Sequence, residues 1–256
     1  MPSPPASSAL FEVRGLVKSY GDLLVLDGLD FDIHEGECLA VLGRSGSGKS
    51  VLLRQLNGLE TPDAGSVVFD GTDLAALSEY DLYPFRRRIA MLFQGGALFD
   101  SMDVYDNLAV PLRGHTDLPE EEIRAKVEEK LEMVRLSGIE DKVPADLSGG
   151  MKKRVALARS LTLDPEVMLF DEPTTGLDPV TSATIAKLIR TVQDRLGVTS
   201  VVVTHDIPLA RTVGDRVAFL YQRRFRFLGD WDEAERSDDE LFAGFLAGRE
   251  EVEDAA

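Results

Sequence analysis

The sequence has a single cysteine and no long apolar run, and these absences exclude several classes of protein. Cys38 alone cannot form a disulfide within the chain, and we interpret it as a small buried residue of the apolar stretch 38–42. No apolar run approaches the roughly 18 residues that a membrane-spanning helix needs. Residues 1–10 also lack the basic start and the apolar stretch of a signal peptide, so we expect a disordered lead there.

Basic residues are scarce as well. The chain has 28 lysines and arginines against 45 acidic residues, a net charge of −17, which argues against a protein that binds by neutralising nucleic-acid phosphates. About half of the excess lies in residues 229–256, where eleven acidic residues stand against two basic ones. Apolar residues recur there at helical spacing, at Leu241, Phe242, Phe245 and Leu246. They favour a short amphipathic helix that docks on this subunit, on a second copy or on a regulator; the alternative is a solvated acidic tail.

Strand and helix patterns follow one another along the rest of the chain. Residues 11–42 alternate between apolar and polar side chains and are broken by glycines, which is typical of strands and turns. The compact apolar segments 167–170 and 199–205 are separated by a helical pattern at 180–196. Such segments are typical of buried parallel strands, so we expect an α/β domain.

A surface helix is predicted over residues 119–136. Its apolar residues recur on one face, at Ile123, Val127, Leu131 and Val134. Three glutamates follow the proline at its start, where negative charge is favoured by the helix dipole.

Residues 43–50 form the clearest chemical motif. Their sequence, GRSGSGKS, fits the pattern G-x-x-x-x-G-K-[ST]; it follows the apolar stretch 38–42 and precedes a helical pattern at 50–57. Glycines allow successive backbone N–H groups to face phosphate oxygens, and the start of a helix adds partial positive charge. We therefore predict ATP binding here, with Lys49 at the β- and γ-phosphates and the hydroxyl of Ser50 on Mg²⁺. The predicted nucleotide-binding residues are Gly43, Arg44, Ser45, Gly46, Ser47, Gly48, Lys49, Ser50 and Val51.

Two carboxylates follow the apolar segment 167–170. Alone, Asp171 and Glu172 fit a strand that runs into a solvated turn. Beside a phosphate-binding loop, however, paired carboxylates are suited to a metal-bound triphosphate. We predict that Asp171 faces Mg²⁺ and that Glu172 acts as the general base for the attacking water.

A third motif lies between these two and carries a family resemblance. Residues 147–151 are Leu147, Ser148, Gly149, Gly150 and Met151. The tripeptide Ser-Gly-Gly alone is typical of a turn that caps a helix. In this order, however, the segment resembles the LSGGQ signature that ABC-type ATPases place between the phosphate loop and the Asp-Glu strand.

The resemblance covers roughly residues 11–229 and implies the ABC ATPase fold. This is an α/β P-loop NTPase with a mixed parallel core sheet, an antiparallel β subdomain and a helical subdomain, here at about 95–160. Residues 230–256 form an acidic C-terminal extension to which the resemblance does not extend. In this family the signature closes over ATP bound by a second subunit, so the resemblance implies a homodimer.

Four single residues match the family's order and spacing, although each alone fits ordinary packing. They are Tyr20, Gln94, Asp178 and His205. The resemblance implies that Tyr20 stacks on adenine and that Asp178 belongs to the D-loop. It also implies that Gln94 contacts Mg²⁺ or the water and that His205 contacts the γ-phosphate. The expected catalytic residues are then Glu172, His205, Gln94 and Lys49, and the expected metal-site residues are Ser50, Gln94 and Asp171.

Two details resemble one branch of the family, the ATPases of Mce-linked, Mla-type phospholipid transporters of double-membraned bacteria. The signature ends in Met151 where most relatives have glutamine. Residues 93–113, which contain Gln94 and are called the glutamine segment below, also resemble the corresponding segment of those ATPases. That segment is expected to form a groove for a cytoplasmic helix of a permease, with core packing as the alternative for Phe99, Val104, Tyr105 and Leu108.

This resemblance implies partners and a location. The implied partners are a second copy of this ATPase subunit, an integral-membrane permease dimer and an Mce-domain lipid-binding protein. A small cytoplasmic regulatory subunit is a further candidate partner, and no binding to nucleic acid is expected. The location is the cytoplasmic face of the inner membrane, with no span in this chain.

Three other functions stay open. The first is transport of another substrate class. The second is a non-transport ABC ATPase acting on ribosomes or DNA, which predicts two cassettes in one chain, a long coiled-coil insertion or a basic surface. The single cassette, the lack of a heptad pattern and the net charge of −17 disfavour it. The third is a nucleotide-gated subunit without turnover, which the presence of Glu172 and His205 disfavours.

Overall fold

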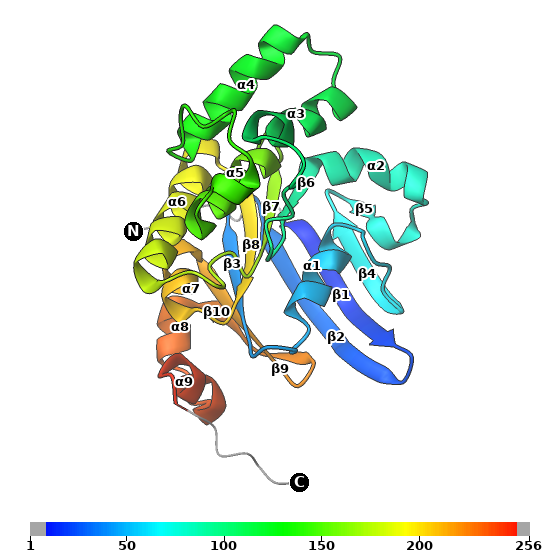
Figure 1. Cartoon of the computed structure of the whole chain (residues 1–256). Coiled ribbons are helices and arrows are strands. Elements are labelled where there is room, and N and C mark those ends of the chain that lie inside the picture. Colours follow the sequence, from blue (N-terminus) through cyan, green and yellow to red (C-terminus); the bar gives the residue numbers. More distant parts are fainter. Residues whose placement is uncertain (1–8, 250–256) are drawn as a thin grey trace, which may run out of the picture.

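Two β-sheets organise the chain in the computed structural model, which describes residues 9–249 (Figure 1). The larger sheet has the strand order β10-β9-β3-β8-β7-β6. It consists of β3 (Cys38–Leu42), β6 (Ile89–Leu92), β7 (Val167–Asp171), β8 (Thr199–Thr204), β9 (Arg216–Tyr221) and β10 (Arg224–Asp230). All neighbours are parallel except β9 and β10. The carboxyl ends of β3, β8 and β7 therefore lie at one edge, where ligands of parallel sheets bind.

The smaller sheet is antiparallel, with the order β2-β1-β4-β5. It consists of β1 (Ala9–Tyr20), β2 (Leu23–His34), β4 (Ala64–Phe69) and β5 (Thr72–Asp73). Strand β1 begins two residues earlier than expected, because Leu10 packs against the apolar core beneath the sheet. The rest of the predicted lead lies outside the described residues. The mixed sheet and the separate antiparallel sheet confirm the predicted fold class.

Helices cover both faces of the large sheet. Alternate residues of each strand point to opposite faces, so α1 (Lys49–Leu56) and the small sheet share a core with one set of strand residues. The other set packs against α6 (Pro179–Leu196) and α7 (Ile207–Val213). Gly58 follows α1 with φ 65, the left-handed conformation in which a glycine commonly ends a helix. A 3₁₀ turn, η1 (Leu74–Ala76), and α2 (Glu79–Arg88) connect β5 to β6.

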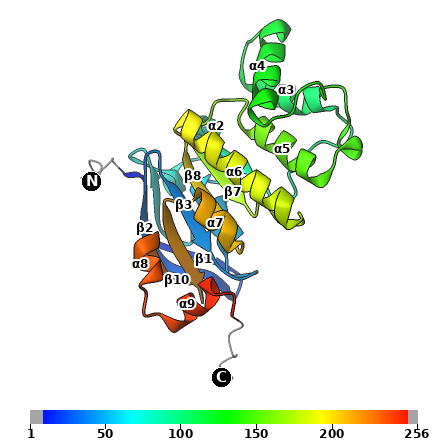
Figure 2. The ribbon, with the colours of Figure 1, turned by 90° about the vertical axis from the view of Figure 1, so that its left-hand side faces the viewer.

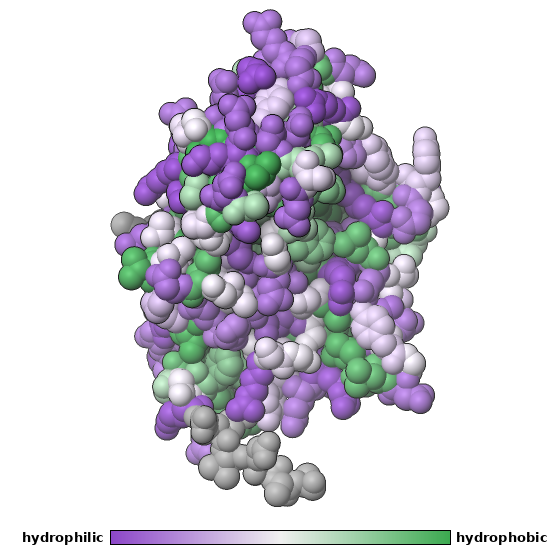
Figure 3. Space-filling view, in the orientation of Figure 1, coloured by the Kyte–Doolittle hydropathy of each residue, from purple (hydrophilic) through white to green (hydrophobic). Residues whose placement is uncertain are grey.

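A helical region is inserted between β6 and β7. It contains α3 (Val104–His115), α4 (Glu120–Met133), the 3₁₀ turn η2 (Pro144–Asp146) and α5 (Gly149–Ser160). The predicted apolar face of the surface helix is buried at all four positions, 123, 127, 131 and 134, and the opposite face is covered mainly by hydrophilic residues (Figure 3). None of the helices within residues 9–249 combines the length and the apolar composition that a membrane span requires.

The C-terminal segment adds α8 (Trp231–Glu235) and α9 (Glu240–Leu246), which lie at the end of the molecule opposite the helical region (Figure 2). Phe242 is fully buried. Its ring stacks on Phe219 and Phe227, with centroids 5.1 and 4.7 Å apart. The amphipathic helix predicted from the spacing is thereby confirmed, and of the three docking surfaces considered, it packs on this subunit. Residues 250–256, the acidic end of the predicted extension, lie outside the described part of the chain.

We predict that Phe242→Ala lowers the free energy of unfolding of the full chain by about 3–5 kcal/mol, because it leaves a cavity between two aromatic rings. Chemical denaturation measures this. Glu240→Ala, at an exposed position of the same helix, is the matched control and is expected to change stability by about 0.5 kcal/mol or less. Equal, small effects for the two variants would show that α9 does not contribute to the core.

Candidate nucleotide-binding site

The phosphate-binding loop connects β3 to α1 and depends on glycine at two positions. Gly46 and Gly48 have φ values of 78 and 102, in the left-handed region. A Cβ on Gly48 would lie 2.9 Å from a methyl carbon of Leu26, so no larger residue fits without a shift. Gly48 precedes α1, and no side chain caps this helix. The first backbone N–H groups of α1 are therefore available to an anion.

Lys49 spans the mouth of this loop. Its side chain is only 5% exposed. Nζ donates hydrogen bonds to the carbonyl oxygens of Gly43 and Arg44, at 2.8 and 2.9 Å, and lies 3.3 Å from Oε1 of Glu172. The buried ammonium is thus held between the loop and the end of β7, with its charge directed at the loop's interior.

Asp171 lies at the carboxyl end of β7, opposite the start of α1. Oγ of Ser50 donates a hydrogen bond of 2.8 Å to its Oδ1. Burial raises the pKa of Asp171, and the hydrogen bond from Ser50 opposes that rise. Two of the three residues predicted for the Mg²⁺ site, Ser50 and Asp171, are therefore paired through oxygen atoms, the ligand type that this metal prefers.

Glu172 has an unusual backbone conformation, with φ 47, which costs about 1 kcal/mol or more for a residue other than glycine. Its N–H donates to the carbonyl of Val203 in β8. Nδ1 of His205 lies 2.9 Å from its Oε2, and the hydroxyl of Thr204 donates to the same oxygen at 3.3 Å. Burial raises the pKa of Glu172, but the contacts with His205 and Lys49 outweigh it and hold the pKa below its usual value. The carboxylate is therefore ionised at neutral pH.

A cavity of about 300 Å³ brings most of the predicted site together. It is lined by Val25, Ser45, Gly46, Gly48, Lys49, Ser50, Val51, Gln94, Glu172, Thr175 and His205. These residues come from the small sheet, the phosphate loop, the glutamine segment and the ends of β7 and β8. Val25 and Thr175 were not predicted, because neither belongs to a motif and the small sheet's approach to the loop is not visible in the sequence.

The signature and Asp178 lie elsewhere. Residues 148–150 and Asp178 line a second cavity of about 380 Å³ that shares no lining residue with the first. Oγ of Ser148 accepts from the N–H of Met151 at the start of α5, and Asp178 caps α6. Leu147 is buried, at 6% exposure. One chain therefore does not place the signature on its own phosphate loop.

Tyr20 lies outside both of these cavities. Its side chain is 44% exposed, and its hydroxyl donates to the carboxylate of Glu60. An exposed ring at the end of β1 is available for stacking, so its assignment to adenine stays a prediction.

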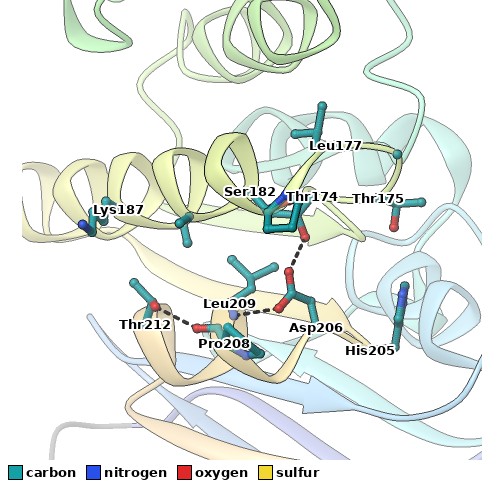
Figure 4. Close-up of a pocket in the computed structure, with 14 residues that line it drawn as sticks. Thr174, Thr175, Leu177, Ser182, Lys187, His205, Asp206, Pro208, Leu209 and Thr212 are labelled. Carbon is teal, nitrogen blue, oxygen red and sulfur yellow. Dashed lines mark hydrogen bonds between the residues drawn. The ribbon is translucent and has the colours of Figure 1, made fainter. Parts of the chain in front are cut away.

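A third cavity, of about 480 Å³, lies between α6 and α7 (Figure 4). Thr175 and His205 line both this cavity and the one at the phosphate loop. Among its lining residues, the hydroxyl of Thr174 donates to Oδ2 of Asp206 at 2.9 Å (Figure 4). This bond, which the sequence did not predict, ties the segment after Glu172 to the residue after His205.

The residues present fit Mg²⁺ and ATP. An uncapped helix start and a buried lysine suit a phosphate group. Among residues 9–249 there is no cluster of three or more histidine, cysteine or acidic residues that would form a metal site made of protein alone. The Ser50–Asp171 pair matches a Mg²⁺ ion that keeps waters and substrate oxygens as its other ligands.

We predict that Gly150→Ala destabilises the chain and that Gly149→Ala does not. A Cβ at position 150 would lie 2.7 Å from Cγ2 of Thr181, whereas one at 149 would lie 3.4 Å from Leu177, an ordinary contact. Overpacking costs about 1–3 kcal/mol, while alanine gains about 0.5–1 kcal/mol over glycine in a helix. Chemical denaturation distinguishes the two. Thr181→Ser removes the methyl group and keeps the hydroxyl bound to Asp178, so it should restore the Gly150→Ala protein; equal losses at 149 and 150 would contradict the account.

Comparison with known proteins identifies the family. Residues 26–175 match the family described as ABC transporter. The chain is 45% identical to the probable ribonucleotide transport ATP-binding protein mkl of Mycobacterium leprae, over 93% of this chain and 69% of that protein. It is 40% identical to the intermembrane phospholipid transport system ATP-binding protein MlaF of Escherichia coli K12, over 93% of this chain and 89% of MlaF.

Two solved structures agree with this match. The dimeric ATP-binding cassette MJ0796 bound to ADP and Pi has a TM-score of 0.79 at 32% identity, over 86% of this chain and 98% of that chain. The cassette cbiO1 of Clostridium perfringens, part of the ABC transporter complex cbiONQ, has a TM-score of 0.82 at 33% identity, over 93% and 95%. The chain therefore belongs to the ABC transporter family, as an ATP-hydrolysing cassette that uses ATP with Mg²⁺.

Proposed function

We propose that two copies of this chain close around two ATP molecules and power phospholipid transport between bacterial membranes through a separate permease. The observation that carries the paired mechanism is the separation of two cavities in one chain, one lined by the phosphate loop and one by the signature. Ser148 and Gly150 of each copy then complete the site of the other, as backbone donors at a helix start. The dimeric state of the solved relative MJ0796 supports this pairing.

The side chains of the phosphate-loop cavity suit hydrolysis. Lys49 and the first N–H groups of α1 hold the phosphates, and Ser50 and Asp171 hold Mg²⁺, which neutralises phosphate charge when it is bound. Ionised Glu172 accepts a hydrogen bond from the attacking water and takes its proton. His205, in contact with Oε2 of Glu172, orients this carboxylate. The family resemblance supports a further role for His205, a contact with the γ-phosphate.

Phospholipid is proposed as the cargo because of how much of each relative's length the alignment covers. MlaF aligns over 89% of its own length, whereas the mkl proteins of Mycobacterium leprae and Mycobacterium tuberculosis align over 69% and 66% of theirs. The match to the phospholipid system therefore covers nearly the whole protein. The higher identity to mkl, 45% against 40%, favours ribonucleotide transport as the second candidate.

The partners and location follow from the same proposal. A permease dimer would receive the segment after Gln94 through one of its cytoplasmic helices, and an Mce-domain protein would bind the lipid. A small cytoplasmic regulatory subunit would complete the assembly. This chain would lie on the cytoplasmic face of the inner membrane.

We predict that Glu172→Gln retains ATP binding but slows turnover by about 10²–10⁴-fold, the contribution of a general base. Because ATP then persists, the protein should form a dimer when Mg-ATP is added. Lys49→Ala should instead weaken ATP binding by at least about tenfold, since a charge-assisted contact to phosphate is lost. Phosphate release, nucleotide binding and mass by light scattering measure the three effects.

Glu132→Gln makes the same chemical change on the exposed face of α4 and is the matched control. It should leave turnover, binding and mass at wild-type values. A Glu172→Gln protein that stays monomeric at saturating Mg-ATP contradicts the paired mechanism.

The cargo is tested on the complex that copurifies with the full chain from detergent-solubilised membranes. We expect a permease and an Mce-domain protein, together with an ATPase rate that rises with added phospholipid and not with ribonucleotides. Stimulation by ribonucleotides, or copurification of an amino-acid-binding protein, would overturn the lipid assignment.

A further inference from the structure

Two basic side chains of helix α5 bind the backbone of the glutamine segment. Nζ of Lys153 donates to the carbonyl oxygen of Gln94. Arg159 donates to the carbonyl oxygens of Gly96 and Ala97, at 3.0 and 2.8 Å. The segment that follows β6 is therefore attached to the signature helix by two cations rather than by apolar packing alone.

Lys153 is the more unusual of the two, because its charge is buried and is influenced by the negative charges of Asp171 and Glu172. The residue is 8% exposed. Burial lowers the pKa of Lys153, while the negative charges of Asp171 and Glu172 oppose that effect. Within residues 9–249, the carbonyl of Gln94 is the one hydrogen-bond acceptor of Nζ. A buried ammonium with so few partners depends on nearby negative charge, so its position is tied to the ionised site.

Helix α5 gives Lys153 a connection to the other cavity. The helix begins directly after Ser148, and Lys153 lies in its second turn. Gln94 lines the phosphate-loop cavity together with Glu172 and His205, whereas Ser148 lines the signature cavity. One short helix therefore has the signature at its start and the backbone of Gln94 on its side. Lys153 itself lines neither cavity, so direct contact with nucleotide is not its role.

We propose that Lys153 is a positioning residue that couples the two nucleotide sites of a pair. When α5 moves to bring Ser148 onto the partner's nucleotide, the bond from Lys153 moves the backbone of Gln94 with it. The attraction of Lys153 to Asp171 and Glu172 keeps the helix close to its own catalytic site in that state. Closure over one nucleotide and alignment of the other site then occur together. The inference rests on the proposed paired function.

Three full-length variants test this role. Lys153→Gln removes the charge and shortens the side chain that reaches the Gln94 carbonyl, Lys153→Arg keeps the charge and the reach, and Lys152→Gln removes the charge of the exposed neighbouring lysine. The measurements are phosphate release against ATP concentration and the thermal midpoint. We expect Lys153→Gln to lower kcat at least about tenfold while KM for ATP changes by less than about twofold. Its Hill coefficient for ATP should fall from nearly 2 to about 1.

Lys153→Arg should restore kcat and cooperativity to within about threefold of wild type, and Lys152→Gln should match wild type. All three are expected to keep the wild-type thermal midpoint, which separates positioning from loss of folding. If wild type and Lys153→Gln bind ATP with the same Hill coefficient near 2, the role proposed for Lys153 is wrong, while the paired function is unaffected. A wild type with a Hill coefficient of 1 and a monomeric Glu172→Gln protein instead contradicts the paired function on which it rests.

Discussion

The rest of the site depends on the buried ammonium of Lys49. A buried charge is stable only where hydrogen-bond acceptors and an opposite charge lie beside it. Here two carbonyl oxygens of the loop and the carboxylate of Glu172 contact the ammonium of Lys49. The loop follows β3, and Glu172 follows β7, which is separated from β3 by β8 alone. Because these strands are parallel, their carboxyl ends meet at one edge. The left-handed backbone of Glu172 and its contact with His205, at the end of β8, then complete the arrangement.

The same arrangement explains what was predictable from the sequence. The phosphate loop is a local motif whose strand, glycines and helix are contiguous, so its geometry follows from residues 38–57 alone. Strand order is not a local property, and the contacts of Lys49 with Glu172 and of Thr174 with Asp206 depend on it. The family resemblance, rather than periodicity, supplied the roles predicted for Gln94 and His205. The C-terminal helix shows what sequence periodicity does not provide. The spacing of apolar residues predicted its apolar face, but only the fold showed that Phe242 packs on Phe219.

Relatives of this chain are named for transport of different substrates. Relatives named for ribonucleotide transport and for phospholipid transport both align over 93% of it. In the proposed function, the side chains around the phosphate loop bind nucleotide in either case, and the partner proteins and the surface that contacts them select the cargo. This chain also connects the segments that line its two cavities, because Lys153 and Arg159 of the signature helix donate hydrogen bonds to the backbone of the glutamine segment.

The most direct test of the paired site is cross-linking between two copies. Ser45 and Ser148 are both exposed and lie beside different cavities, so one copy is prepared as Ser45→Cys and the other as Ser148→Cys, both in the Glu172→Gln background. The native Cys38 is buried and does not compete for the reagent. A short bismaleimide should join the mixed copies when Mg-ATP is present and not in its absence. Mixed copies that fail to cross-link with Mg-ATP, or that cross-link equally without it, would contradict a nucleotide held between the loop of one copy and the signature of another.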